Sequence, residues 1–178
     1  MDARVHRVQG KTEFVAVMPG SLDLLQEFHR DKLASLVRHL STARIVAQYD
    51  ANNAYQYVIA REDVQLGWLG EAIVALGGAV HDEAAAASAR PPSGAEVTAT
   101  AVAHDVRAAQ EFVDLWRPRI ETMDDARFRG MLRIIIGETL EHKRFFEQAL
   151  AGRTDLLGLR SDAVGARVGT VLPTRWIE

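Results

Sequence analysis

Large apolar side chains recur at alternating steps of four and three residues over a long central stretch of this sequence. The series is Tyr55, Ile59, Leu66, Leu69, Ile73 and Leu76, with Glu62 filling the remaining step. Residues at this spacing share one face of an α-helix, and the alternation is typical of a helix that packs lengthwise in a bundle. Gly77 and Gly78 follow, and they predict the end of the helix because glycine adopts the left-handed cap conformation readily.

Three further stretches have helical spacing. Their apolar positions are Leu25, Leu33, Leu36 and Leu40; then Val102, Val106, Ala109, Val113, Trp116 and Ile120; then Phe128, Met131, Ile135, Phe145 and Ala149. We predict N-caps at Ser21 and Asp124, an end or kink near Arg117 caused by Pro118, and a final end before Gly152. The sequence therefore predicts an all-α chain, a four-helix bundle.

The stretch between the second and third helices, residues 79–96, is poor in large apolar residues and contains Pro91 and Pro92. Fully extended it reaches up to about 60 Å, whereas a helix of about 25 residues is about 38 Å long. We expect a long crossover along the bundle rather than a tight turn. The predicted domains are an N-terminal extension (1–20), the bundle (21–152, with crossover linker 79–96) and a C-terminal docking tail (153–178).

Composition excludes several functions. A net charge of −3 and a pI near 6.1 give no long-range attraction for nucleic acid or anionic membranes, so we expect neither as a partner. The absence of cysteine excludes disulfides, thiolate nucleophiles and iron–sulfur clusters, which leaves His, Asp and Glu as metal ligands. The chain lacks an apolar run of about 18 residues and an apolar signal core, so we expect a cytoplasmic location.

Charged residues interrupt the apolar faces in two places. Glu62 lies in the middle of the central series, and Glu138 and His142 share the face of Ile135 in the last stretch. An isolated buried carboxylate shifts its pKa, pairs with a cation or binds a metal. With the last turn at residues 123–124, His142 lies level with Asp105, so these residues form a candidate site.

A first-helix histidine is a further candidate. A turn at residues 50–53 places Glu62 level with His39, whereas a turn near residues 45–46 places it level with His29. We favour His29, because it shares a face with Leu25 and Leu33.

With paired hairpins, a long crossover and the stretches REDVQLGWLGEAIVALGG and ETLEHKRFFEQAL, residues 21–152 resemble the ferritin-like superfamily, in its rubrerythrin and bacterioferritin style. The resemblance implies iron or manganese, with oxidoreductase or metal-handling activity. The family's iron site takes one Glu from each of two helices and a Glu-x-x-His motif from each of the other two. On this chain the resemblance places one Glu-x-x-His motif on Glu62 and Gln65. It places the other on Thr139 and His142, with Glu138 adjacent. The two single Glu positions are occupied by His29 and Asp105.

The residues also support a metal-free alternative. Glu62, Glu138 and His142 then form a metal-free polar cluster, or they pair with nearby arginines such as Arg38 or Arg61, and buried ion pairs of this sort fix the register of the helices. In that case the chain is a dimeric interaction or scaffold protein.

Two other features bear on association. We expect the apolar segment 171–177 to dock across a homodimer interface or in a groove, and we interpret Gly67 and Gly70 as close-packing glycines. The sequence assigns neither a substrate nor an enzymatic activity.

Overall fold

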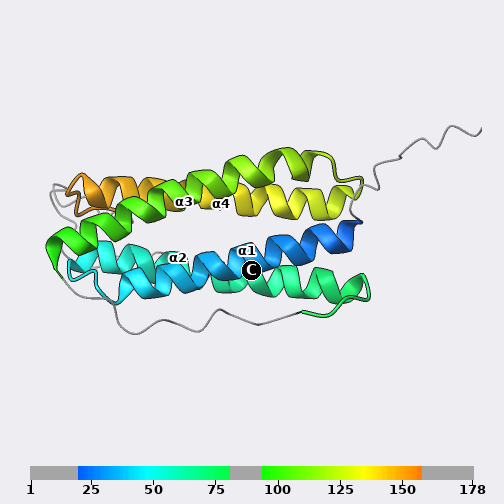
Figure 1. Cartoon of the computed structure of the whole chain (residues 1–178), viewed down its shortest axis with the longest axis horizontal. Helices are drawn as coiled ribbons and strands as arrows, with labels where there is room; N and C mark the ends of the chain where they lie inside the picture. The colour runs from blue at the N-terminus through cyan, green and yellow to red at the C-terminus, as the bar shows by residue number, and fades with distance from the viewer. Residues whose placement is uncertain (1–19, 81–93, 158–178) are drawn as a thin grey trace, which may run out of the picture.

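The computed structural model describes residues 20–80 and 94–157, which form four α-helices and no strand. The helices are α1 (Ser21–Ala43), α2 (Tyr49–Ala75), α3 (Ala95–Glu121) and α4 (Ala126–Leu150) (Figure 1). The predicted all-α, four-helix bundle is confirmed. The segments 1–19, 81–93 and 158–178, and with them the predicted docking of residues 171–177, lie outside the described residues.

The helices pack as two pairs. α1 lies along α2 and α3 along α4, and the pairs meet through α1–α3 and α2–α4 contacts, while the backbones of α2 and α3 lie farther apart. Figure 1 shows that α2 and α3 run in the same direction, each starting at the same end of the bundle. An adjacent α2–α3 hairpin is therefore excluded, and the route of the linker between them stays a prediction.

Two predicted N-caps are wrong. Ser21 is the first helical residue of α1, which follows Gly20 without a side-chain cap. The cap of α4 is Asp125 rather than Asp124, and its Oδ1 accepts bonds of 2.9 and 3.1 Å from backbone N–H groups of the first turn. Asp124 and Asp125 are adjacent and of the same type, so the sequence alone allows either of them to cap the helix. In the folded backbone it is Asp125 that lies within reach of those N–H groups.

The predicted ends at Gly77 and Gly152 are confirmed, whereas the end that was one of the two outcomes predicted at Pro118 does not occur. Gly77 and Gly152 have φ of 77° and 75°, so both adopt the left-handed conformation after α2 and α4. Pro118 does not end α3, which continues to Glu121. Burial of Ile120 in the core holds this last turn in place and offsets the hydrogen bond that proline cannot donate.

The core consists of two apolar clusters with a polar layer between them. One cluster includes Leu25, Phe28, Leu69, Trp116 and Ile135, and the other includes Tyr55, Val58, Val102 and Phe146. The polar layer consists of Lys32, Ser35 and His39 of α1, Glu62 and Gln65 of α2, Asp105 of α3, and Thr139 and His142 of α4, all buried. Every helix thus turns polar side chains inward at the middle of the bundle.

The buried face of α1 differs from the predicted one. Leu33 and Leu36 are only partly buried and Leu40 is 40% exposed, whereas Lys32 and His39 are buried. The true seam continues from Leu25 through Phe28, Lys32, Ser35, His39 and Thr42, also at steps of three and four. The leucines were predicted to face the core because they are the most apolar residues of this helix. That criterion takes no account of buried polar groups that form hydrogen bonds or ion pairs with one another.

Candidate functional site

Lys32 and Glu62 form an ion pair at the centre of the polar layer. Nζ of Lys32 lies 2.8 Å from Oε1 of Glu62, and each side chain is only 1% exposed. The same ammonium lies 3.5 Å from Oγ1 of Thr139, whose hydroxyl donates to the backbone carbonyl of Ile135. The pair thereby connects α1, α2 and α4.

His39 holds the other oxygen of Glu62. Its Nδ1 lies 2.8 Å from Oε2, and its Nε2 lies 3.9 Å from Oδ1 of Asp105, so the ring stands between two carboxylates. Burial alone would raise the pKa of Glu62, but His39 and Lys32 outweigh it and lower the pKa to about 2. Glu62 is therefore ionised, and Nδ1 of His39 carries the hydrogen in this bond.

Asp105 is also held at both oxygens. Nε of Arg38 donates to Oδ1 at 2.9 Å, and the hydroxyl of Tyr55 donates to Oδ2 at 2.7 Å. Burial and the charge of Asp105 raise the pKa of Tyr55, so the phenol keeps its proton and remains a donor. In the polar layer the two carboxylates, Glu62 and Asp105, are thus balanced by the two cations Lys32 and Arg38.

Glu138 lies at the edge of the polar layer, with its side chain 22% exposed. Arg61 donates to one of its oxygens and the amide of Gln65 to the other. The pairing of Arg61 with Glu138 confirms that part of the metal-free interpretation. It also leaves this carboxylate turned toward α2 rather than toward His142.

His142 is the group in the polar layer with the most unused bonding capacity. Neither of its ring nitrogens has a hydrogen-bond partner among the described residues, and the same holds for Nε2 of His39 and Oε1 of Gln65. Burial and the nearby charge of Lys32 lower the pKa of His142 to about 3. The imidazole is therefore neutral at physiological pH, with one nitrogen free to accept a bond and the other free to donate one.

The candidate metal ligands are poorly arranged to bind a divalent cation. The oxygens of Glu62, Asp105 and Glu138 are all engaged by donors of the chain itself. Within residues 20–80 and 94–157, no group of three or more His, Asp or Glu side chains is placed to hold a metal ion. A metal here would have to compete with Lys32, which already supplies positive charge at this position.

The fifth predicted ligand, His29, lies apart from the others. It is buried, but it lines a cavity of about 180 Å³ together with Gln26, Arg30, Ile73 and Ala79. The structure places His39 rather than His29 beside Glu62, so the preference for His29 is wrong. The turn does lie near residues 45–46, but Glu62 bonds both Lys32 and His39, which are seven positions apart on α1, so counting from the turn does not select the residue in contact.

Lys32 was missed by the sequence interpretation. A lysine in a leucine-rich helix is normally assigned to the surface, because a buried ammonium is costly without a partner. Its burial could have been predicted from its spacing, because Phe28, Lys32 and His39 all lie on one face of the helix. Its partner Glu62 on another helix could not be inferred from that spacing.

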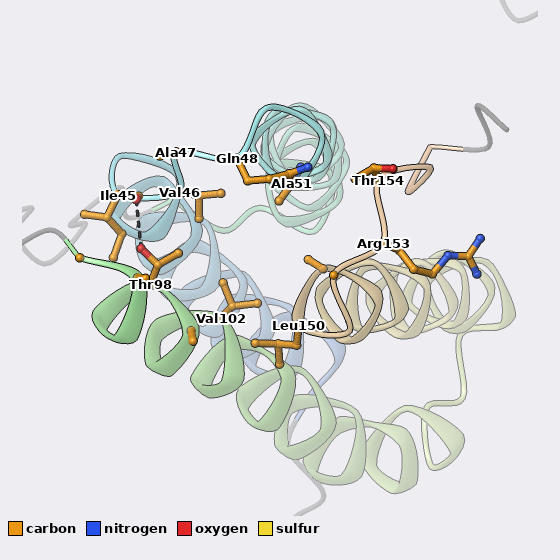
Figure 2. A pocket seen from close by; sticks show the side chains of 15 residues that line it. Ile45, Val46, Ala47, Gln48, Ala51, Thr98, Val102, Leu150, Arg153 and Thr154 are labelled. Atoms are coloured by element: carbon orange, nitrogen blue, oxygen red, sulfur yellow. Dashed lines mark hydrogen bonds between the residues drawn. The ribbon is translucent and has the colours of Figure 1, made fainter. Parts of the chain in front are cut away.

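A separate cavity of about 530 Å³ lies at the end of the bundle where the α1–α2 connection, the start of α3 and the end of α4 meet (Figure 2). Its walls are mainly apolar and include Ile45, Val46, Ala51, Val102 and Leu150. The hydroxyl of Thr98 donates to the backbone carbonyl of Ile45, as Figure 2 shows. The cavity suits an apolar group and brings no catalytic set of side chains together.

Comparisons of the chain with protein-family models, with curated proteins and with solved structures give no match. Among the helices formed by residues 20–80 and 94–157, none is long and apolar enough to cross a membrane.

Proposed function

We propose that this chain is a metal-independent, ferritin-like helical bundle that acts as a homodimeric interaction or scaffold protein. The observation that carries the proposal is Lys32, whose ammonium is bonded to Glu62 inside the core. Once a lysine supplies the positive charge that a carboxylate site requires, the bundle core is complete without a metal. Removing one partner of such a pair is costly, so the arrangement fixes how the helices fit together.

The surroundings of the polar layer support a structural role for it. Three cavities in the described part of the chain, of about 530, 580 and 180 Å³, are lined by residues other than Lys32, Glu62 and His142. A substrate in those cavities would contact none of these three side chains, whereas catalytic groups must contact what they transform; the cavity of about 580 Å³ reaches the polar layer at Arg38, which is bonded to Asp105. On this proposal the function belongs to the surface of the bundle.

One observation favours a second candidate, the iron or manganese protein that the resemblance implies. A neutral, buried histidine with two unpartnered nitrogens is a suitable metal ligand, and His142 has this form. Glu62 could join it only if Lys32 moved away. In that candidate the bound metal would supply redox chemistry, and this chain's residues would hold it.

Elemental analysis of protein from cells grown with added iron and manganese separates the candidates. The metal-independent bundle predicts well below one metal ion per chain and a melting temperature that a chelator does not change. About one ion per chain, lost in both Glu62→Ala and His142→Ala but kept in the surface control Glu141→Ala, would overturn the proposal. Lys32→Met, which removes the competing ammonium, shows whether Lys32 is what keeps metal out.

A further inference from the structure

The cavity at the end of the bundle (Figure 2) is continuous with the second apolar cluster of the core. Val46, Ala51 and Val102 belong both to that cluster and to the walls of the cavity. Its volume is about 530 Å³, whereas protein interiors are close-packed and contain few voids larger than a water molecule. An apolar hollow of this size, open at the end of a core, marks a place where a further apolar group packs.

Three polar side chains on the walls of the cavity are already bonded within the chain. The hydroxyl of Thr98 donates to the carbonyl of Ile45 at 3.1 Å, and the side-chain oxygen of Gln48 accepts from a backbone N–H in the first turn of α2. Arg153 donates two bonds to Asp155, and in Figure 2 its guanidinium points away from the other labelled residues. A polar occupant gains no new bond from these groups, so the cavity favours an apolar one.

The chain itself leads to this cavity after α4. Gly152, Arg153 and Thr154 form part of the wall, and Leu156, which is 4% exposed, packs in the second apolar cluster. The segment that follows Leu157 therefore starts beside the cavity. Because it is tethered there, its effective concentration at the cavity is on the order of millimolar, which favours it over a separate molecule present at micromolar concentration.

The segment 171–177 has the side chains that such a cavity requires. Its sequence is VLPTRWI, with four large apolar residues, and it begins 14 positions after Leu157, a length of chain that reaches up to roughly 45 Å. The linker 81–93 also ends beside the cavity, since Gly94 lines it, but its sequence contains no apolar side chain larger than proline. Composition therefore favours the segment 171–177 over the linker.

The N-terminal segment starts from the other end of the bundle. Gly20 precedes α1, whose 23 residues span about 34 Å before the chain arrives at the cavity. The apolar run at residues 14–18 lies within six positions of Gly20 and reaches at most about 22 Å from it. This run is therefore too close to Gly20 along the chain to fill the cavity.

We infer that residues 171–177 dock in the cavity of their own chain, with their apolar side chains against Val46, Val102 and Leu150. The docked segment ties the α1–α2 connection to the start of α3 and the end of α4, and it closes this end of the bundle. An external apolar molecule then enters the cavity only by displacing the segment. The inference requires one copy of the chain, so it stands independently of the proposed homodimer.

Cysteine pairs test the docking on the full chain, because the parent has no cysteine. Ala99→Cys with Thr174→Cys should form a disulfide within one chain under mild oxidation, since Ala99 lines the cavity. Ala126→Cys with Thr174→Cys is the matched control. Ala126 is also an exposed helical alanine, but it lies about 36 Å from Leu150, at the opposite end of α4.

The chain from Leu157 to Thr174 is long enough to reach either alanine, so an undocked segment would crosslink to both. Docking predicts that the Ala99 pair forms its disulfide at least tenfold faster than the Ala126 pair. Equal rates would overturn the inference. Disulfides formed between two chains and not within one would also overturn it, because the segment would then lie on a second copy.

An apolar dye, anilinonaphthalene sulfonate, provides the second measurement, because it binds exposed apolar surface. The double variant Leu172→Ser and Trp176→Ser should bind several-fold more dye than the parent, since its cavity is open. Val164→Ser with Val168→Ser, which changes the same tail outside the docking segment, is the control and should match the parent. Equal dye binding by the parent and the Leu172 and Trp176 variant, whether strong or weak, would overturn the inference.

Discussion

His142 should make the bundle sensitive to mild acid. In the unfolded chain this histidine has its ordinary pKa of 6.5, and in the folded protein burial and the charge of Lys32 lower the pKa to about 3. Below pH 6.5 the unfolded state therefore binds a proton that the folded state does not. The free energy of unfolding then falls by up to about 1.4 kcal/mol per pH unit, and by roughly 2.3 kcal/mol between pH 6.5 and 4.5, because the unfolded histidine is already half protonated at pH 6.5.

This pH window separates His142 from Glu62. The pKa of Glu62 is lowered from 4.5 to about 2, so its contribution is fully present above pH 4.5 and is lost only as the pH falls from there toward 2. A loss of stability between pH 6.5 and 4.5 thus reports the buried histidine rather than the buried carboxylate.

Urea unfolding at pH 7.5, 6.5, 5.5 and 4.5 measures the effect. The parent should lose about 2–3 kcal/mol between pH 6.5 and 4.5 beyond what His142→Gln loses, because glutamine does not titrate. His104→Gln, at an exposed position of α3, is the control and should follow the parent. If His142→Gln loses as much stability as the parent does over this window, His142 is not buried in its neutral form and the reasoning fails.

Three further predictions concern stability. Lys32→Met should lower the free energy of unfolding by about 3–5 kcal/mol at pH 7, because Glu62 keeps its charge but loses its cation; a loss under 1 kcal/mol by chemical denaturation would contradict a buried pair. Phe28→Ala should cost about 3–5 kcal/mol in the same assay, since the ring is fully buried and packs edge-on against two other aromatic rings. Asp125→Ala should cost about 1 kcal/mol through the lost cap of α4, whereas Asp124→Ala should be nearly neutral, and the reverse order of melting temperatures would restore Asp124 as the cap.

The helices were predictable because their signals are local. The steps of four and three through Tyr55 and Ile73, and the glycines at 77 and 152, depend only on helical geometry and on the left-handed conformation that glycine adopts. The cap errors, Asp124 for Asp125 and Ser21 for Gly20, are one residue in size, because neighbouring residues compete for one cap position. The error at Pro118 is larger, because burial of Ile120 carries α3 on to Glu121.

The contents of the core were less predictable. Glu62, Asp105 and His142 were recognised as unusual because they interrupt or flank apolar seams, and all three are buried. Lys32 and His39 were not chosen, because sequence patterns rank single residues, whereas burial of a charge depends on a partner elsewhere in the chain. Helical spacing cannot identify that partner, since it carries no information about the stagger between two helices.

The number of helices, their approximate limits and the presence of charges at the middle of the bundle follow from the sequence, because periodicity and capping act within a few residues. What those charges do depends on which helices pack together. Lys32, 30 positions from Glu62 along the chain, meets it at 2.8 Å inside the core. A carboxylate buried beside a lysine is a structural ion pair, whereas the same carboxylate beside free donor ligands could hold a metal, and the difference is set by which helices pack together.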